Sequence, residues 1–150
     1  MSPAENLKRL SIELPKPAVA VANYVPWVKS GKLIFVSGQL PMLNGKLAQT
    51  GQLTSVAAGA EAAKIAAINV LAHLNDVTQG DLNKIARIVK ITGFVSCAAD
   101  FVDHAKVVNG ASDLFVEVFA EKGRHARSSV GVSSLPLGAS VEVEAIAELE

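Results

Sequence analysis

Residues 127–136 read Arg-Ser-Ser-Val-Gly-Val-Ser-Ser-Leu-Pro, and after a short turn residues 141–144 read Val-Glu-Val-Glu. The alternation at every second position predicts two strands, and the Leu-Pro-Leu-Gly segment between them predicts a turn, so we expect a hairpin-like pair. Because successive side chains of a strand point to opposite faces, Arg127 and Ser129 share one face. On the second strand Glu142 and Glu144 share one face, and Val141 and Val143 point to the other.

Arg127 and Glu142 are the two charged groups of this stretch that suggest chemistry. An arginine offers a rigid fork of donors that matches a carboxylate. A glutamate offers a base, or an acceptor that can hold a water molecule. An Arg and a Glu on paired strands also form ordinary surface ion pairs, and the spacing alone favours that interpretation. The upstream sequence decides between a functional site and an ordinary surface ion pair.

Composition limits the class of protein. The chain has 150 residues, of which half are apolar and 19% are charged, so residues 1–150 predict one globular domain with a core. The 14 basic and 14 acidic residues cancel, and no run of Lys or Arg exceeds two. Nothing here resembles a basic, aromatic-rich surface for nucleic acid, so a nucleic-acid partner is not expected.

The single cysteine, Cys97, excludes an internal disulfide and suits a reducing compartment. We find neither an apolar leader segment nor an apolar run of about 18 residues, so we expect a cytoplasmic protein with no membrane partner. The apolar excess combined with low charge favours a homo-oligomer, because it leaves apolar surface to be covered.

The N-terminal segment predicts a short helix and a linker over residues 1–19. Ser2, Pro3 and Glu5 have the order of a capping box with a proline in the first turn. The Leu-Pro-Lys-Pro segment at 14–17 ends the helix, since proline disfavours helix at its own position and at the one before it.

A β-rich segment follows. Residues 23–28 predict a strand that Pro26 restricts to an edge or bulged position, and residues 32–36 predict a compact apolar strand. The glycine of Ser37-Gly38 allows the backbone to approach a ligand closely. Asn44-Gly45 is a strong hairpin signal, so we expect a β meander.

Two amphipathic helices alternate with the remaining strands. Residues 55–74 predict an alanine-rich helix, and residues 85–95 predict a strongly apolar strand. A second helix follows, with Asp100 or a neighbour as its cap and Gly123 at its end. The expected class is α+β, with two helices on one face of a sheet. Another subunit is the simplest cover for the opposite face.

Several common sites are missing from the sequence. The three histidines lie far apart and lack metal spacing with Cys97, so we expect no metal site. There is no phosphate-binding loop, dinucleotide fingerprint or nucleophile elbow, and no histidine is placed to activate Ser37. We interpret His73 as structural, and we expect no cofactor.

Five segments carry a family resemblance. They are Asn23-Tyr24, the Ser-Gly-Gln-Leu-Pro of 37–41, the Ile-Val-Lys-Ile-Thr-Gly-Phe-Val of 88–95, and the segments 127–136 and 141–144. Together they resemble the RidA (YjgF) family of reactive-intermediate deaminases, also known as L-PSP endoribonucleases, over roughly residues 20–150. The N-terminal helix and the amino-acid sequence of residues 24–28 resemble those of a longer, less characterised subgroup.

The resemblance implies a fold like that of bacterial chorismate mutase, and a homotrimer with a ligand pocket in each of its three clefts between subunits. It implies hydrolysis of 2-imino acids, the tautomers of enamines, to 2-oxo acids and ammonia without a cofactor. The family's carboxylate-binding arginine falls on Arg127, its water-orienting glutamate on Glu142 and its active-site tyrosine on Tyr24. The positions that correspond to substrate-binding residues are Ser37, Gly38, Asn109 and Ser129.

Two positions depart from the family pattern. The family's reactive cysteine is Ser129 here, so thiol-dependent behaviour should be missing, although the backbone carbonyl at this position could still hold the water. The residue two before the arginine, commonly proline in the family, is His125. We interpret His125 as a solvated loop residue in preference to a local proton carrier.

Three functions stay open at this point, in decreasing order of support. The first is a deaminase of small 2-imino acids. The second is a trimer that binds 2-oxo acids through Arg127 without useful turnover. The third is a ribonuclease or translation inhibitor, which neither the charge balance nor a histidine pair supports. A working Glu142 favours the first function over the second.

Overall fold

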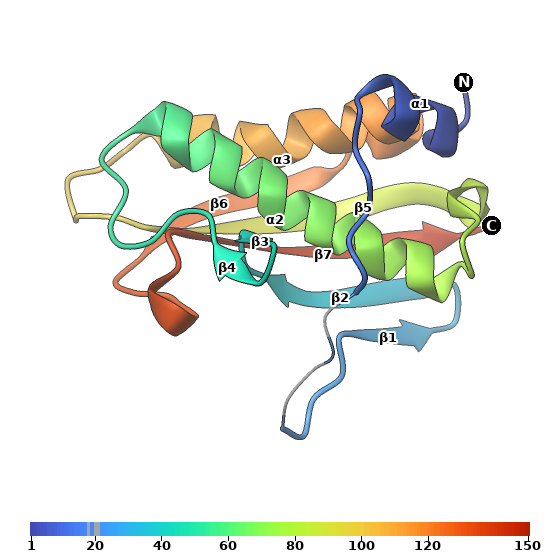
Figure 1. Cartoon of the computed structure of the whole chain (residues 1–150), viewed down its shortest axis with the longest axis horizontal. Coiled ribbons are helices and arrows are strands. Elements are labelled where there is room, and N and C mark those ends of the chain that lie inside the picture. Colours follow the sequence, from blue (N-terminus) through green and yellow to red (C-terminus); the bar gives the residue numbers. More distant parts are fainter. Residues whose placement is uncertain (18, 20–21) are drawn as a thin grey trace.

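The computed structural model describes residues 1–17, 19 and 22–150, and its architecture is a sheet covered on one face by helices (Figure 1). Two long helices lie side by side on that face, and a short helix packs at one end of them. This confirms the expected α+β, chorismate-mutase-like class. The helices are α1 (Pro3–Arg9), α2 (Val56–Val77) and α3 (His104–Phe119). The strands are β1 (Trp27–Ser30), β2 (Leu33–Gln39), β3 (Met42–Leu43), β4 (Lys46–Leu47), β5 (Ile85–Ser96), β6 (Ala126–Val132) and β7 (Val141–Leu149).

The main sheet has the strand order β1-β2-β7-β5-β6, and the expected hairpin of β6 with β7 is wrong. β5 lies between these two strands, parallel to β6 and antiparallel to β7. The long β5 is apolar on its helix-facing side, where Ile88 and Ile91 are fully buried, so it requires a neighbour at each edge. The segment 133–140 carries the chain across the end of β5, where Ser140 O accepts from Ser96 N at 2.9 Å.

The core lies between the sheet and the two long helices. The alanine-rich stripe of α2 allows a close approach to α3, and a methyl group at Gly110 would overlap the carbonyl oxygen of Ala60. Leu71 and Phe115 fill the space that remains and are fully buried. Small residues where α2 and α3 approach each other, and large residues beside them, therefore fix the position of α3 over β5 and β6.

The opposite face of the sheet has no helix over it in the described chain. Val28 on β1 and Phe35 on β2 are paired across the strands, yet they remain 51% and 41% exposed. Val130 on β6 is 42% exposed on the same side. Apolar side chains on an open sheet face indicate a surface that associates. The homotrimer stays a prediction.

Local signals at the N-terminus are confirmed. Ser2 Oγ accepts from Glu5 N at 3.2 Å, and Glu5 Oε2 accepts from Ser2 N at 2.7 Å, which completes the capping box. Asn6 donates its side-chain amide to Val118 O on α3 at 3.0 Å and so attaches α1 to the body of the fold. The linker predicted up to residue 19 includes residue 18, which lies outside the described residues.

Some details differ from the sequence prediction: α2 continues to Val77, and α3 ends at Phe119 with a 3-10 turn up to Gly123. The first strand begins at Trp27, because Pro26 has no N–H for a ladder, so most of the strand expected over 23–28 is not formed. The cap of α3 is Asp103, not Asp100. The hairpin turn at Asn44-Gly45 is confirmed, but β3 and β4 form a separate ribbon and do not extend a meander. None of the described helices is long and apolar enough to cross a membrane.

Candidate active site

Arg127 lies on the edge strand β6, against α3. Its Nη1 donates to Asn109 Oδ1 at 2.8 Å and to Ser112 Oγ at 3.1 Å. Asn109 and Ser112 are three residues apart on α3 and so share a helix face. Within the described residues, Nε and Nη2 of Arg127 have no hydrogen-bond partner. The guanidinium is thus held from one side while its other donors stay available.

His125 supports this arrangement and is not the solvated loop residue that we expected. It is half-buried, its ring packs edge-on against Phe115, and its Nε2 lies 2.9 Å from Ser112 Oγ. Its Nδ1 lies 2.6 Å from Gly123 O. Burial lowers the pKa of His125 below its ordinary value, the hydrogen bond to Gly123 O opposes this, and the nearby positive charge of Arg127 lowers the pKa further.

Ser129 follows Arg127 on the same face of β6 and pairs with Gly93 of β5. Gly93 is small because Val108 of α3 occupies the space that a side chain would need. The hydroxyl oxygen of Ser129 is buried and has no hydrogen-bond partner among the described residues. An unpaired buried hydroxyl is costly, which makes it a natural point for a ligand or a water molecule to bind.

Glu142 and Gly38 form a second group of residues, on the open face of the sheet. β2 bulges between Val36 and Gln39, and this brings Gly38 directly under the Glu142 side chain. A methyl group at Gly38 would overlap Glu142 Oε1, so only glycine leaves room for the carboxylate as it stands. Partial burial raises the pKa of Glu142 above its ordinary value, and the charge of Glu144 raises it further.

Tyr24 lies next to this second group. It lines a hollow of about 180 Å³ together with Gly38, and its side chain is 56% exposed. Ser37 holds the segment in place, because its hydroxyl donates to Val25 O at 2.8 Å and its backbone N–H donates to Pro26 O at 2.9 Å. The Ser37 hydroxyl proton is therefore already used, and only its oxygen lone pairs remain for a ligand.

Arg127 and its neighbours lie on one face of the sheet, and Glu142 and its neighbours lie on the other. Arg127 is in register with Ile91, which is in register with Ala145, whereas Glu142 is in register with Phe94. The two backbones are therefore about 10 Å apart across the strands and about 10 Å apart along them, with side chains pointing to opposite sides. One small ligand cannot contact both side chains within a single chain.

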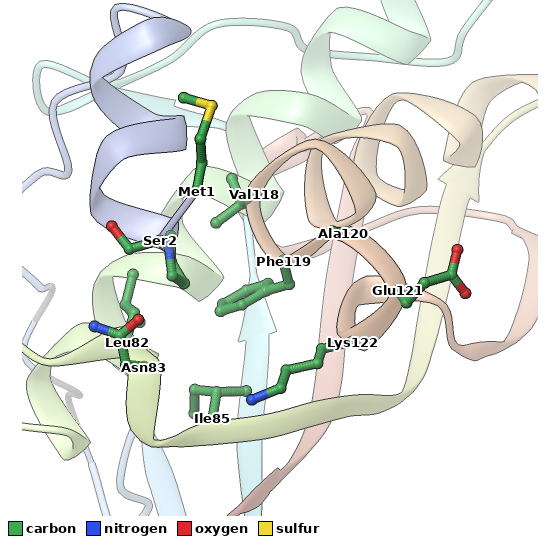
Figure 2. Close-up of a pocket in the computed structure, with 11 residues that line it drawn as sticks. Met1, Ser2, Leu82, Asn83, Ile85, Val118, Phe119, Ala120, Glu121 and Lys122 are labelled. Carbon is green, nitrogen blue, oxygen red and sulfur yellow. The ribbon is translucent and has the colours of Figure 1, made fainter.

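A metal site is not evident in the described residues, where no group of three or more His, Cys, Asp and Glu side chains could hold an ion. Cys97 Sγ and His104 Nε2 are 3.5 Å apart, but two ligands do not make a closed site. A hollow of about 340 Å³ lies far from the predicted site residues, between α1 and the end of α3. Figure 2 shows Met1, Phe119 and Ile85 around it, and this lining is mostly apolar.

The chain belongs to the YjgF/RidA family. Residues 5–149 match the family described as "YjgF/chorismate_mutase-like, putative endoribonuclease". The Trypanosoma cruzi protein TCP17 is 45% identical over 150 residues, which cover 97% of this chain and 93% of TCP17. The Escherichia coli 2-iminobutanoate/2-iminopropanoate deaminase is 34% identical over 131 residues, which cover 85% of this chain and 88% of the deaminase.

Solved structures agree with this membership. The Agrobacterium tumefaciens protein Atu1372, described as having unknown function, has a TM-score of 0.93 and 46% identity, covering 99% of this chain and 92% of its own. E. coli TdcF with bound serine has a TM-score of 0.66 and 28% identity, and the match covers 90% of this chain and 94% of TdcF. The relatives with a named activity are thus more distant than TCP17 and Atu1372.

Proposed function

We propose that this protein hydrolyses small 2-imino acids to 2-oxo acids and ammonia, in clefts that two copies of a homotrimer share. The observation that carries the proposal is the state of Arg127. Asn109 and Ser112 hold its Nη1, and this leaves Nε and Nη2 side by side for a ligand carboxylate. The named activity of the E. coli deaminase, and the serine bound to TdcF, suit a small ligand with a carboxylate.

The two groups of residues divide the reaction between them. Arg127 fixes the carboxylate and with it the adjacent imine carbon. Glu142, whose pKa is raised, takes a proton from water as the oxygen attacks that carbon. Glu142 then returns this proton to the nitrogen, which gives a carbinolamine with one hydroxyl and one amino group. The hydroxyl proton next passes by way of Glu142 to the amino nitrogen, the C–N bond breaks, ammonia leaves, and the carbonyl of the 2-oxo acid forms. Water supplies the oxygen and both hydrogens, so no other reactant is needed.

The opposite orientation of the two groups supports a shared cleft. Arg127 of one copy must meet Glu142 of another for a single ligand to contact both. The exposed apolar side chains Val28 and Phe35 lie on the same open face as Glu142, so association through this face would bring its residues to a neighbour. In this arrangement Tyr24 and Gly38 border the cleft from the Glu142 side, and Asn109 and Ser129 from the Arg127 side.

A coupled assay tests the proposal. An amino-acid oxidase generates the imino acid from alanine or 2-aminobutanoate, and its disappearance is timed with and without the protein. We expect the wild type to accelerate hydrolysis and Arg127→Ala to abolish the acceleration. Arg127→Lys should also fail substantially, because a point charge does not reproduce the fork.

Arg124→Lys is the matched control. Arg124 lies on the adjacent loop, where its Nε pairs with Glu121 at 3.0 Å and stays exposed. This variant should keep wild-type activity. No acceleration by the wild type would refute the proposed activity. Wild-type activity in Arg127→Lys would show that the arginine does not hold the carboxylate through two donors.

A binder of 2-oxo acids is the second candidate, because the Arg127 group is complete within one chain and does not need Glu142 to hold a carboxylate. Glu142→Gln separates the two functions. A catalyst should lose turnover by about 10²-fold while pyruvate affinity changes little. Equal losses of rate and affinity would mean that Glu142 only supports ligand binding. A ribonuclease has no support from the balanced charge of the chain.

A further inference from the structure

A chain of hydrogen bonds runs from a backbone carbonyl to the guanidinium of Arg127. Gly123 O contacts His125 Nδ1 at 2.6 Å, His125 Nε2 contacts Ser112 Oγ at 2.9 Å, and Ser112 Oγ accepts from Arg127 Nη1 at 3.1 Å. The four connected residues are Ser112 in the middle of α3, Gly123 and His125 in the segment that follows the helix, and Arg127 at the start of β6. Ser112 is not among the site residues predicted from the sequence, and His125, predicted to be solvated, is half-buried.

The direction of each bond follows from the chemistry of its ends. A carbonyl oxygen only accepts, so Nδ1 of His125 carries the proton that points to Gly123 O. Burial lowers the pKa of His125 and the charge of Arg127 adds to this, which together outweigh the raising effect of the hydrogen bond to Gly123 O. The lowered pKa favours the neutral ring, whose Nε2 is an acceptor. Ser112 then donates its hydroxyl proton to Nε2. Its oxygen lone pairs are turned toward Arg127.

The packing around this chain holds each part in place. Phe115 lies one turn after Ser112 on α3 and presents its ring to His125, with the ring centroids 6.0 Å apart and an interplanar angle of 81°. The two α3 side chains in contact with His125, Ser112 and Phe115, are uncharged, and Arg127 is the charged group that lowers the pKa of the imidazole. Gly123 in turn has no space for a side chain, because a methyl group there would overlap Phe115 O.

We propose that Ser112 and His125 are positioning residues that fix the Arg127 guanidinium for a ligand carboxylate. The proposal rests on the function proposed above. Asn109 alone would leave the guanidinium free to rotate about a single hydrogen bond, whereas two acceptors on α3 fix its plane. The ligand must then approach the Nε and Nη2 edge, which sets the position of the imine carbon relative to the attacking water.

Pyruvate affinity and imine hydrolysis measured on variants test the proposal. We expect Ser112→Ala and His125→Ala each to weaken pyruvate binding by about 10-fold, the usual effect of losing a hydrogen bond to a charged group. Because both residues act through one chain, the double variant should bind about as weakly as either single variant. Ser112→Thr retains the hydroxyl and should recover most of the affinity. Asp113→Asn changes an exposed neighbour on α3 and serves as the control.

The protonation state of His125 distinguishes the proposed hydrogen-bond chain from a purely structural role, which would not require a particular protonation state. Imidazole ¹H–¹⁵N correlation spectra of the wild type at neutral pH should show His125 neutral, with its proton on Nδ1. A proton on Nε2 would overturn the chain of donors. Wild-type pyruvate affinity in both alanine variants would also overturn it, while the proposed function would stand. If the wild type neither binds pyruvate nor hydrolyses imines, the proposed function fails, and with it any role of the chain in holding a carboxylate.

Discussion

Replacing Gly38 with alanine tests whether the position of the Glu142 carboxylate matters. The added methyl carbon would overlap Glu142 Oε1 and lie 2.8 Å from Cδ and 3.1 Å from Cγ. Carbon atoms in favourable contact are about 3.5–4.0 Å apart, so the carboxyl group must move by about 1 Å. The φ angle of Gly38 is not positive, so alanine fits the backbone, and the flexible glutamate can swing aside without unfolding the sheet.

A displacement of about 1 Å in a catalytic group can lower the rate by about 10²-fold. We therefore expect Gly38→Ala to reduce kcat for imine hydrolysis by about that factor, with pyruvate affinity and melting temperature little changed. A double-mutant cycle with Glu142→Ala gives the sharper result, because Gly38→Ala should have no further effect once the carboxylate is gone. Full activity in Gly38→Ala would refute the role of a fixed Glu142 carboxylate.

Three further outcomes are expected. Because the folded pKa of Glu142 is raised above its ordinary value of 4.5, its stabilising contribution is present below that pH and is lost as pH rises through the folded pKa. Glu142→Gln should therefore melt at a higher temperature than the wild type at pH 8, with the difference shrinking toward pH 4, and an unchanged difference would contradict this. Gly110→Ala should lower the free energy of unfolding in urea by about 2–3 kcal/mol, because the methyl group would overlap backbone at Ala60, and an unchanged midpoint would show that α2 and α3 can separate cheaply. Light scattering should give a trimer for the wild type and a smaller species for Phe35→Lys, whereas a wild-type monomer would remove the shared cleft.

Local signals in the sequence predicted most of the elements, and the pairing of distant strands was less accessible. The capping box at Ser2 and the turn at Asn44-Gly45 depend on a few neighbouring residues, so the sequence specifies them directly. β6 and β7 each show a clear alternation, but nothing local reveals that β5 lies between them. That order depends on the need of a long apolar strand for two neighbours and on the α3 crossover.

The site shows the same contrast between features that local sequence predicts and features that depend on the pairing and packing of distant segments. Arg127 and Glu142 were identifiable from their motifs, and their location on opposite faces followed only from the register through β5. Ser112 was missed, although its spacing of three from Asn109 places both on one helix face. His125 alternates with Arg127, so a shared side of the strand could have been noticed. Its burial against Phe115 depends on the packing of α3 and had no signal in the local sequence.

Mixing two kinds of inactive subunit tests whether Arg127 and Glu142 of different copies share a cleft. Arg127→Ala and Glu142→Gln should each be inactive alone. In trimers assembled at random from equal amounts of both, about one quarter of the clefts should combine an intact arginine with an intact glutamate. We therefore expect recovery of about a quarter of the wild-type rate of imine hydrolysis. No recovery, from subunits shown to exchange and with an active wild type, would contradict the shared cleft.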